Sequence, residues 1–155
     1  MKKLPALVVL LLLVSCAKYD ISATEDFADN RWQKGNVKSF NFTFKIGKDE
    51  NADISVQFSH IADPQYTEVP LEITIQEPSG KKETLNVTLK LKDSQGRELS
   101  DCAGDVCDFT EMIKANAPIT SGKYIFTVKN KFNGAYLPNA LAVGIAMHFV
   151  RGENK

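Results

Sequence analysis

Apolar and polar residues alternate along most of the chain, in six runs. The apolar positions are Phe40, Phe42, Phe44 and Ile46; Ile54, Val56 and Phe58; Leu71, Ile73 and Ile75; Leu85, Val87, Leu89 and Leu91; Tyr124, Phe126 and Val128; and Leu141, Val143, Ile145, Met147 and Phe149. Alternation with a period of two is typical of strands with one buried face. The runs predict an all-β fold, an antiparallel β-sandwich of the jelly-roll or immunoglobulin-like kind. A closed β-barrel is the alternative, because periodicity identifies strands and not their pairing.

Turn residues separate these runs. Pro78-Ser79-Gly80 divides the third run from the fourth, and Asp93-Ser94-Gln95-Gly96 closes the fourth. Residues Asp108–Lys114 are predicted as a short helix, with an aspartate as N-cap and a glutamate three residues later. The stretch Lys92–Thr120 is long for a sandwich connection, and loops of that length are often functional.

The first residues indicate an export signal. Lys2 and Lys3 precede an apolar run, Leu4–Val14, that is interrupted by one proline. As a helix this run reaches roughly 16 Å, whereas the hydrocarbon core of a bilayer is roughly 30 Å thick. It is too short to span a membrane and has the length of a signal-peptide core. We therefore predict a cleavable signal over residues 1–15.

The run ends at Leu13-Val14-Ser15-Cys16, which is similar to the lipobox of bacterial lipoproteins. It predicts that Cys16 becomes a lipidated N-terminus, and two or more acyl chains hold a protein stably on a bilayer. The alternative is an ordinary signal peptide with an incidental cysteine. Ala17 is not the aspartate that retains lipoproteins in the inner membrane, so the outer membrane is favoured. Apart from this covalent lipid, no cofactor is predicted.

The mature chain has the length of one domain and a net charge close to zero. Removal of residues 1–15 from 155 leaves 140 residues, enough for a single core. It also removes two of the 19 basic residues and none of the 19 acidic ones, so the net charge becomes −2. No basic patch predicts nucleic-acid binding. Residues 16–29 are polar without sustained periodicity and are predicted as a flexible tether, with a single β-sandwich over residues 30–151.

Two cysteines remain beside Cys16. Cys102 and Cys107 stand close in sequence with Gly104 between them, and in an exported protein such a pair predicts a local disulfide. Free thiols and a metal site are the alternatives. A structural zinc site needs four ligands, and His60 and His148 are the remaining histidines. No metal is predicted.

Several motifs in order carry a family resemblance. They are the lipobox; Asn30-Arg31-Trp32; Phe40-x-Phe42-x-Phe44; Leu71–Ile75 leading into Pro78-Ser79-Gly80; Asp93-x-x-Gly96; Gly122-Lys123-Tyr124; and Val143-Gly144-Ile145. Together they resemble the GldH family of gliding-motility lipoproteins from the Bacteroidota. The resemblance covers nearly all of the mature chain. It implies a lipoprotein needed for the gliding apparatus and the secretion system linked to it, and it supplies no catalytic motif. The Cys102/Cys107 loop is not recognised as a feature of that family.

The sequence gives little support to an enzyme. It has no nucleophile elbow, phosphate loop, zinc-protease motif or dinucleotide fingerprint. His148 is out of phase with the apolar face of its strand, and His60 ends a run before a turn. Both histidines are expected at the surface. We predict a protein without catalytic activity.

Two binding functions remain. A glycan-binding module needs exposed aromatic rings, and Trp32, Tyr66 and Tyr136 are the aromatics placed in loops, although Trp32 is expected to close one end of the sandwich. The other function is a non-catalytic subunit of an envelope complex. Its partner contacts are predicted in Lys92–Thr120 and around Trp32 and Tyr136. The last strand also has a second face of small residues, which fits against either a loop of this chain or a partner; these are Ala142, Gly144, Ala146 and His148.

Overall fold

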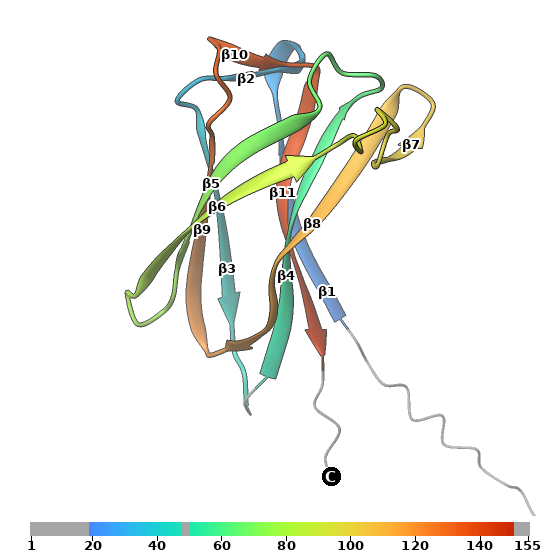
Figure 1. Ribbon diagram of the computed structural model, residues 1–155. Helices are drawn as coiled ribbons and strands as arrows, with labels where there is room; N and C mark the ends of the chain where they lie inside the picture. Colours follow the sequence, from blue (N-terminus) through green and yellow to red (C-terminus); the bar gives the residue numbers. More distant parts are fainter. Residues whose placement is uncertain (1–18, 48–49, 151–155) are drawn as a thin grey trace, which may run out of the picture.

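The computed structural model describes residues 19–47 and 50–150, and these form two packed antiparallel sheets (Figure 1). The larger sheet has the strand order β1 (Tyr19–Asp26), β11 (Ala140–Val150), β4 (Glu50–Ile61), β8 (Val106–Ile119) and β7 (Asp101–Ala103). The smaller sheet has the order β3 (Val37–Phe44), β9 (Gly122–Asn130), β5 (Glu68–Gln76) and β6 (Lys82–Lys90). A two-stranded ribbon, β2 (Arg31–Gln33) with β10 (Tyr136–Pro138), and a 3₁₀ turn, η1 (Ala28–Asn30), complete the fold. The predicted β-sandwich is confirmed, and the sheets do not close into a barrel.

Each predicted run coincides with a strand, and most of its apolar side chains form the core between the sheets. Ile46 and Leu91 lie just beyond their strands, and Leu141 is half-buried where the β11–β4 register shifts. The rings of Phe42 and Phe126 meet edge to face across β3 and β9, with centroids 5.6 Å apart. Phe44 reaches across to Phe149 of the opposite sheet, at 5.3 Å. The run on β6 is the least buried, because Leu85 and Val87 lie on an edge strand and are only half-buried. Burial of the alternating faces against each other therefore accounts for the sandwich.

The tether predicted over residues 16–29 is wrong for its described part. Residues 19–26 form β1, which pairs with β11 from Tyr19↔Phe149 to Asp26↔Ala142. Ile21 and Ala23 pack against the core, so the domain begins at Tyr19 and not at Asn30. An edge strand with two inward apolar side chains, Ile21 and Ala23, among polar and acidic residues gives little periodic signal. The predicted signal over 1–15 and the lipidation of Cys16 lie outside the described residues.

The helix predicted over Asp108–Lys114 and the long loop Lys92–Thr120 are also wrong. Most of this stretch is β7 and β8, and β8 pairs with β4 along its length. The Ser59 hydroxyl donates a hydrogen bond to the Asp108 carboxylate, so this aspartate joins two strands and does not cap a helix. Pairing of this stretch with the long strand β4 outweighs the local N-cap pattern, because such a pattern alone determines helix formation only weakly.

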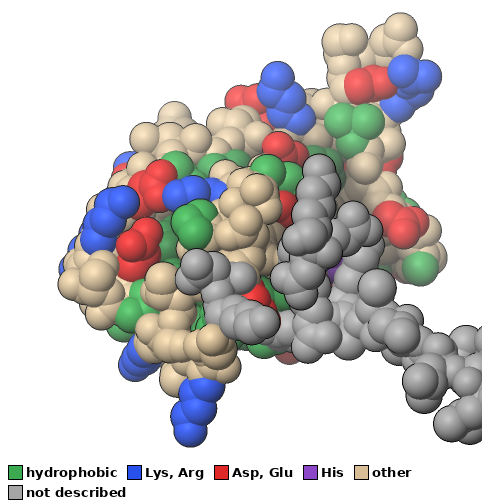
Figure 2. All heavy atoms as spheres, turned by 90° about the horizontal axis from the view of Figure 1, so that it is seen from below, with side chains coloured by type: hydrophobic (Ala, Val, Ile, Leu, Met, Phe, Trp, Pro, Cys, Tyr) green, Lys and Arg blue, Asp and Glu red, His purple; other side chains and the backbone are tan. Residues whose placement is uncertain are grey.

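The sandwich has two unlike ends. At the lower end in Figure 1, β1 begins and β11 ends, and short connections over residues 45–47, 77–81 and 120–121 join the strands. Figure 2 looks onto this lower end, where basic and acidic side chains are interspersed. At the upper end lie the longer connections, over residues 27–36, 62–67, 91–105 and 131–139. The candidate residues Trp32, Tyr66 and Tyr136 all belong to the upper end.

Candidate functional site

Trp32 closes the upper end of the sandwich, as the sequence predicts. Its side chain is fully buried and stacks on Phe27, with ring centroids 4.7 Å apart. The indole Nε1–H donates a hydrogen bond to the Asn36 carbonyl at 2.8 Å, and Leu137 of β10 lies opposite Trp32 in the ribbon. A buried indole requires such an acceptor, and this one is local. Trp32 is therefore a structural residue, and its predicted role as a contact for a partner or glycan is corrected.

Tyr66 is also part of the core. The ring is 7% exposed and packs near Phe132, with centroids 5.7 Å apart. Its hydroxyl donates to the Pro138 carbonyl at 2.9 Å, which ties residues 62–67 to β10. Burial, with a smaller contribution from the nearby Glu98 carboxylate, raises the pKa of Tyr66 well above its ordinary value. This hydroxyl stays protonated, and the expected glycan contact at Tyr66 is corrected as well.

Tyr136 is the aromatic candidate that reaches the surface. Its side chain is 36% exposed, and the Arg31 guanidinium lies over the ring, 4.8 Å from the centroid. Arg31 and Tyr136 stand at opposite ends of the short β2–β10 ribbon, where Pro138 faces Arg31 in the register. The stacked pair offers one flat, cationic surface beside the Trp32 plug.

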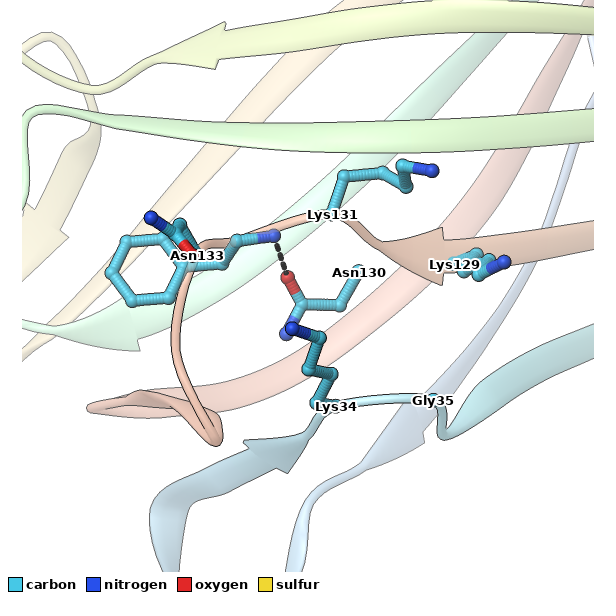
Figure 3. Close-up of a pocket in the computed structure, with 7 residues that line it drawn as sticks. Lys34, Gly35, Lys129, Asn130, Lys131 and Asn133 are labelled. Carbon is cyan, nitrogen blue, oxygen red and sulfur yellow. Dashed lines mark hydrogen bonds between the residues drawn. The ribbon is translucent and has the colours of Figure 1, made fainter.

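A basic pocket lies next to this ribbon, and Figure 3 shows its lining. The cavity has a volume of about 550 Å³ and is formed by the turn after β2 and the end of β9. Its lining residues are Lys34, Gly35, Lys129, Asn130, Lys131, Phe132 and Asn133. Three of these residues are lysines and none is acidic, while Glu72 of β5 pairs with Lys131 and lies opposite Lys129 in the register. Such a pocket attracts an anionic group.

The Asn130 side chain links the two chain segments that form the basic pocket. Its side chain is 4% exposed and donates from Nδ2 to the Trp32 carbonyl at 3.2 Å, while Oδ1 accepts from the Phe132 N–H at 2.8 Å (Figure 3). Lys131 lies 3.6 Å from the Glu72 carboxylate. It is the one of the three lysines for which the structure gives a carboxylate partner within the described chain. The sequence offered no signal for this pocket, because Lys34 is far in sequence from Lys129 and Lys131.

The cysteines form the expected disulfide. Cys102 on β7 and Cys107 on β8 are directly opposite in the register and are bonded to each other. Gly104 has φ +63°, the left-handed conformation that this tight hairpin requires. The bridge makes the β7–β8 hairpin a small rigid projection at the upper end.

His60 is buried, and the expectation of a surface position is corrected. Its side chain is fully enclosed, with Nδ1 2.9 Å from the Ile61 carbonyl and Nε2 2.8 Å from the Ser100 hydroxyl. The Glu98 carboxylate is 3.9 Å from Nε2. Both ring nitrogens are thus engaged within the fold, and Ser100 links the connection after β6 to β4. Across residues 19–47 and 50–150, no cluster of three or more His, Cys, Asp or Glu is placed to hold a metal ion.

His148 lies at the surface, as expected, and its Nδ1 contacts the Asp20 carboxylate of β1. On the same face of β11, Gly144 is buried under β1: a Cβ atom there would lie 2.5 Å from Thr24 Cγ2 and 2.6 Å from the Ala23 carbonyl. The small residues of this face therefore admit a segment of the same chain. The sequence left open whether these small residues face the same chain or a partner protein. At Gly144 the neighbour is the same chain, through β1.

The sequence of residues 20–147 matches the GldH lipoprotein family. The chain belongs to this family. Membership in a lipoprotein family supports attachment to the cell envelope through a lipid, and within the described residues no helix has the length and apolarity needed to cross a bilayer. No curated protein matches the chain.

Among solved structures, the chain is similar to parts of longer proteins. For dimeric latent PorU from Porphyromonas gingivalis the identity is 11% and the TM-score 0.37, covering 84% of this chain and 13% of that one. For the structure of the Gx strain of infectious bursal disease virus the identity is 17% and the TM-score 0.36, covering 90% of this chain and 34% of that one. For BuGH86wt in complex with neoagarooctaose the identity is 14% and the TM-score 0.31, covering 89% of this chain and 20% of that one. This chain spans only a minor part of each of these proteins.

Proposed function

We propose that this GldH-family protein is a non-catalytic subunit of a cell-envelope complex, one that serves gliding and the secretion machinery linked to it. A lipid on Cys16 attaches it to the outer membrane, and its upper end binds a protein partner. Family membership supports the lipoprotein part of this proposal. The observation that carries the partner surface is the basic pocket beside the exposed Arg31–Tyr136 pair.

The chemistry of the upper end fits a protein partner with acidic side chains. Arginine and tyrosine are enriched where protein interfaces have their strongest contacts. In the pocket beside them Lys34 and Lys131 are exposed and Lys129 is half-buried, and Lys131 shares its charge with Glu72. A carboxylate entering the pocket gains favourable electrostatic energy without displacing an acidic lining residue. The disulfide-bonded β7–β8 hairpin adds a rigid edge at the same end.

The polar groups of the upper end support a structural role over a catalytic one. Catalytic groups are usually titratable side chains held ready for a substrate. Here the His60 imidazole bonds to Ile61 and Ser100, and the Tyr66 hydroxyl bonds to Pro138. These groups connect long segments of chain to the sandwich, which accounts for their burial without any reaction.

The glycan-binding alternative has lost most of its support. A sugar platform needs exposed rings, and two of the three aromatic candidates, Trp32 and Tyr66, are buried. Tyr136 remains exposed, but Arg31 covers one face of its ring. Recovery of glycan is therefore kept as an outcome of the test below.

The test is a crosslinked pull-down of the intact lipoprotein from its own envelope. The variant Lys34→Glu/Lys131→Glu reverses two charges at the basic pocket. The matched control, Lys81→Glu/Lys82→Glu, makes the same charge change at the exposed turn between β5 and β6, at the other end of the sandwich. We expect motor or secretion components with the wild type and the control, and at least a fivefold loss with the pocket variant, roughly 1 kcal/mol of binding free energy.

Two outcomes would contradict the proposal. A folded pocket variant that keeps every partner would remove the pocket from the interface, and recovery of glycan in place of protein would favour the alternative function. Lipidation is tested separately with Cys16→Ala, which should abolish incorporation of labelled fatty acid. A variant that still incorporates the label would refute the anchor.

A further inference from the structure

The start of β1 lies very close in sequence to the predicted anchor. Only Ala17 and Lys18 separate Cys16 from Tyr19, the first residue of β1. Three consecutive Cα–Cα steps of about 3.8 Å reach at most about 11 Å, whatever their conformation. If residues 16–29 were a flexible tether, the linkage would be much longer and the domain free to turn. Pairing of β1 with β11 removes that freedom.

Tyr19 also marks one particular end of the molecule. It pairs with Phe149, so the first and last described strands meet at the lower end of the sandwich (Figure 1). The connections over 45–47 and 120–121 lie at the same end, and they are joined because the Ser121 hydroxyl donates to the Ile46 carbonyl at 3.0 Å. A lipid at Cys16 therefore holds this end within about 11 Å of the membrane surface.

We propose that the lower end of the sandwich rests on the lipid headgroups and that the strands stand away from the membrane plane. This inference rests on the lipid anchor of the proposed function. The ten steps from Ala140 to Val150 span about 34 Å at about 3.4 Å per residue. The basic pocket and the Arg31–Tyr136 pair are thereby presented about 35 Å from the bilayer, as a site for a protein of the envelope space.

The short linkage by itself also permits the sandwich to lie on its β1 edge, and the charges of β1 disfavour that arrangement. Along this strand the carboxylates of Glu25 and Asp26 are exposed, with Lys38 3.1 Å from that of Glu25, while Asp20 lies at the lower end beside His148. Charges near an anionic lipid surface change the interaction by about 1 kcal/mol each, and carboxylates are repelled. The lower end instead exposes Lys45 and Lys123, next to its connections. Basic and acidic side chains are interspersed there (Figure 2). Contact with headgroups is thus more favourable through the lower end.

Lipid-to-protein fluorescence quenching tests this orientation. The full-length lipidated protein is placed in vesicles of phosphatidylethanolamine and phosphatidylglycerol that carry a headgroup-linked quencher. A fluorophore is attached to Lys123→Cys at the lower end or to Lys34→Cys at the upper end, both exposed positions. We expect several-fold stronger quenching at position 123. Equal quenching at the two positions, or stronger quenching at position 34, would overturn the orientation.

A longer linkage provides the control. Insertion of about twelve Gly and Ser residues between Lys18 and Tyr19 adds a flexible coil of roughly 20 Å. We expect the difference between the two positions to shrink strongly, and a difference that persists unchanged would overturn the role of the short linkage. The mass of each preparation shows whether Cys16 carries lipid. An unlipidated protein would refute the proposed anchor, whereas a lipidated protein with equal quenching would refute only the orientation.

Discussion

The two ends of the sandwich are closed in different ways. At the lower end, an exposed side chain joins two short connections: the Ser121 hydroxyl accepts from the Ile46 N–H at 2.8 Å and donates to the Ile46 carbonyl. At the upper end, buried side chains perform this task for long segments, as Asn130 does for Trp32 and Phe132. Every buried backbone N–H or C=O group needs a hydrogen-bond partner. The partner is an exposed hydroxyl at the lower end and a buried amide at the upper end.

This difference has an energetic consequence. The hydrogen bonds of Ser121 are exposed, so water replaces them readily when the hydroxyl is lost. The groups bonded to Asn130 and His60 are enclosed, and water cannot reach them without opening the upper end. We therefore expect substitutions at the upper end to be costly and equivalent substitutions at the lower end to be mild.

The largest effect is expected from Trp32→Ala. It removes the plug that stacks on Phe27 and leaves a cavity at the upper end. The free energy of unfolding should fall by about 3–5 kcal/mol, measured by urea denaturation. Tyr136→Ala, on the same ribbon but exposed, is the control and should change it by less than about 1 kcal/mol. Similar losses for both variants would show that Trp32 is not the plug.

The second prediction compares the two ends directly. Asn130→Ala strands the Trp32 carbonyl and the Phe132 N–H in the interior and should cost about 1–3 kcal/mol of unfolding free energy. Ser121→Ala removes the two exposed bonds to Ile46 and should cost about 1 kcal/mol or less. Both are measured by thermal or urea unfolding. An equal or larger cost for Ser121→Ala would contradict the contrast between the ends.

The disulfide should make a smaller contribution to the free energy of unfolding. Cys102→Ser/Cys107→Ser opens a loop of sequence separation 5, for which chain entropy predicts a loss of about 2 kcal/mol. The oxidised protein should gain two daltons on reduction. Reaction of both thiols with an alkylating reagent before reduction would refute the bridge in the native protein.

The smallest effect concerns alkaline pH. Burial raises the pKa of Tyr66 in the folded state, while the unfolded chain ionises near pH 10. The unfolded state therefore loses this proton first, and stability should decrease as the pH rises above about 10. Tyr66→Phe should weaken that decrease between about pH 9 and pH 11, followed by urea unfolding. The same decrease in both proteins would assign it to other groups.

The sequence predicts the core well, because six strands bury one face and expose the other. The strands it misses are those whose periodicity is interrupted. In β8, Glu111 occupies an inward position between Phe109 and Ile113, and the register with β4 shifts near Ile54. In β1, the inward signal among the described side chains is limited to Ile21 and Ala23. These strands depend on pairing with β4 and β11, which a linear pattern does not contain.

For the candidate site, the sequence identified the Trp32 plug and the disulfide but not the basic pocket. His60 continues the phase of Ile54, Val56 and Phe58, so its burial was readable from the same period of two. Tyr66 has no such signal, since its position depends on Pro138. The pocket depends on a turn meeting the end of β9, two segments that only the folded chain brings together.

The pairing of β1 with β11 also determines how the sandwich would respond to a pull at its first strand. A load applied between Cys16 and the upper end pulls Tyr19 along the direction of β1. The hydrogen bonds between antiparallel strands are perpendicular to the strands, so such a load shears all the β1–β11 bonds together and does not peel them one by one. Gly144 permits this close contact beneath Thr24. The β1–β11 pairing therefore resists a pull along β1 as one unit.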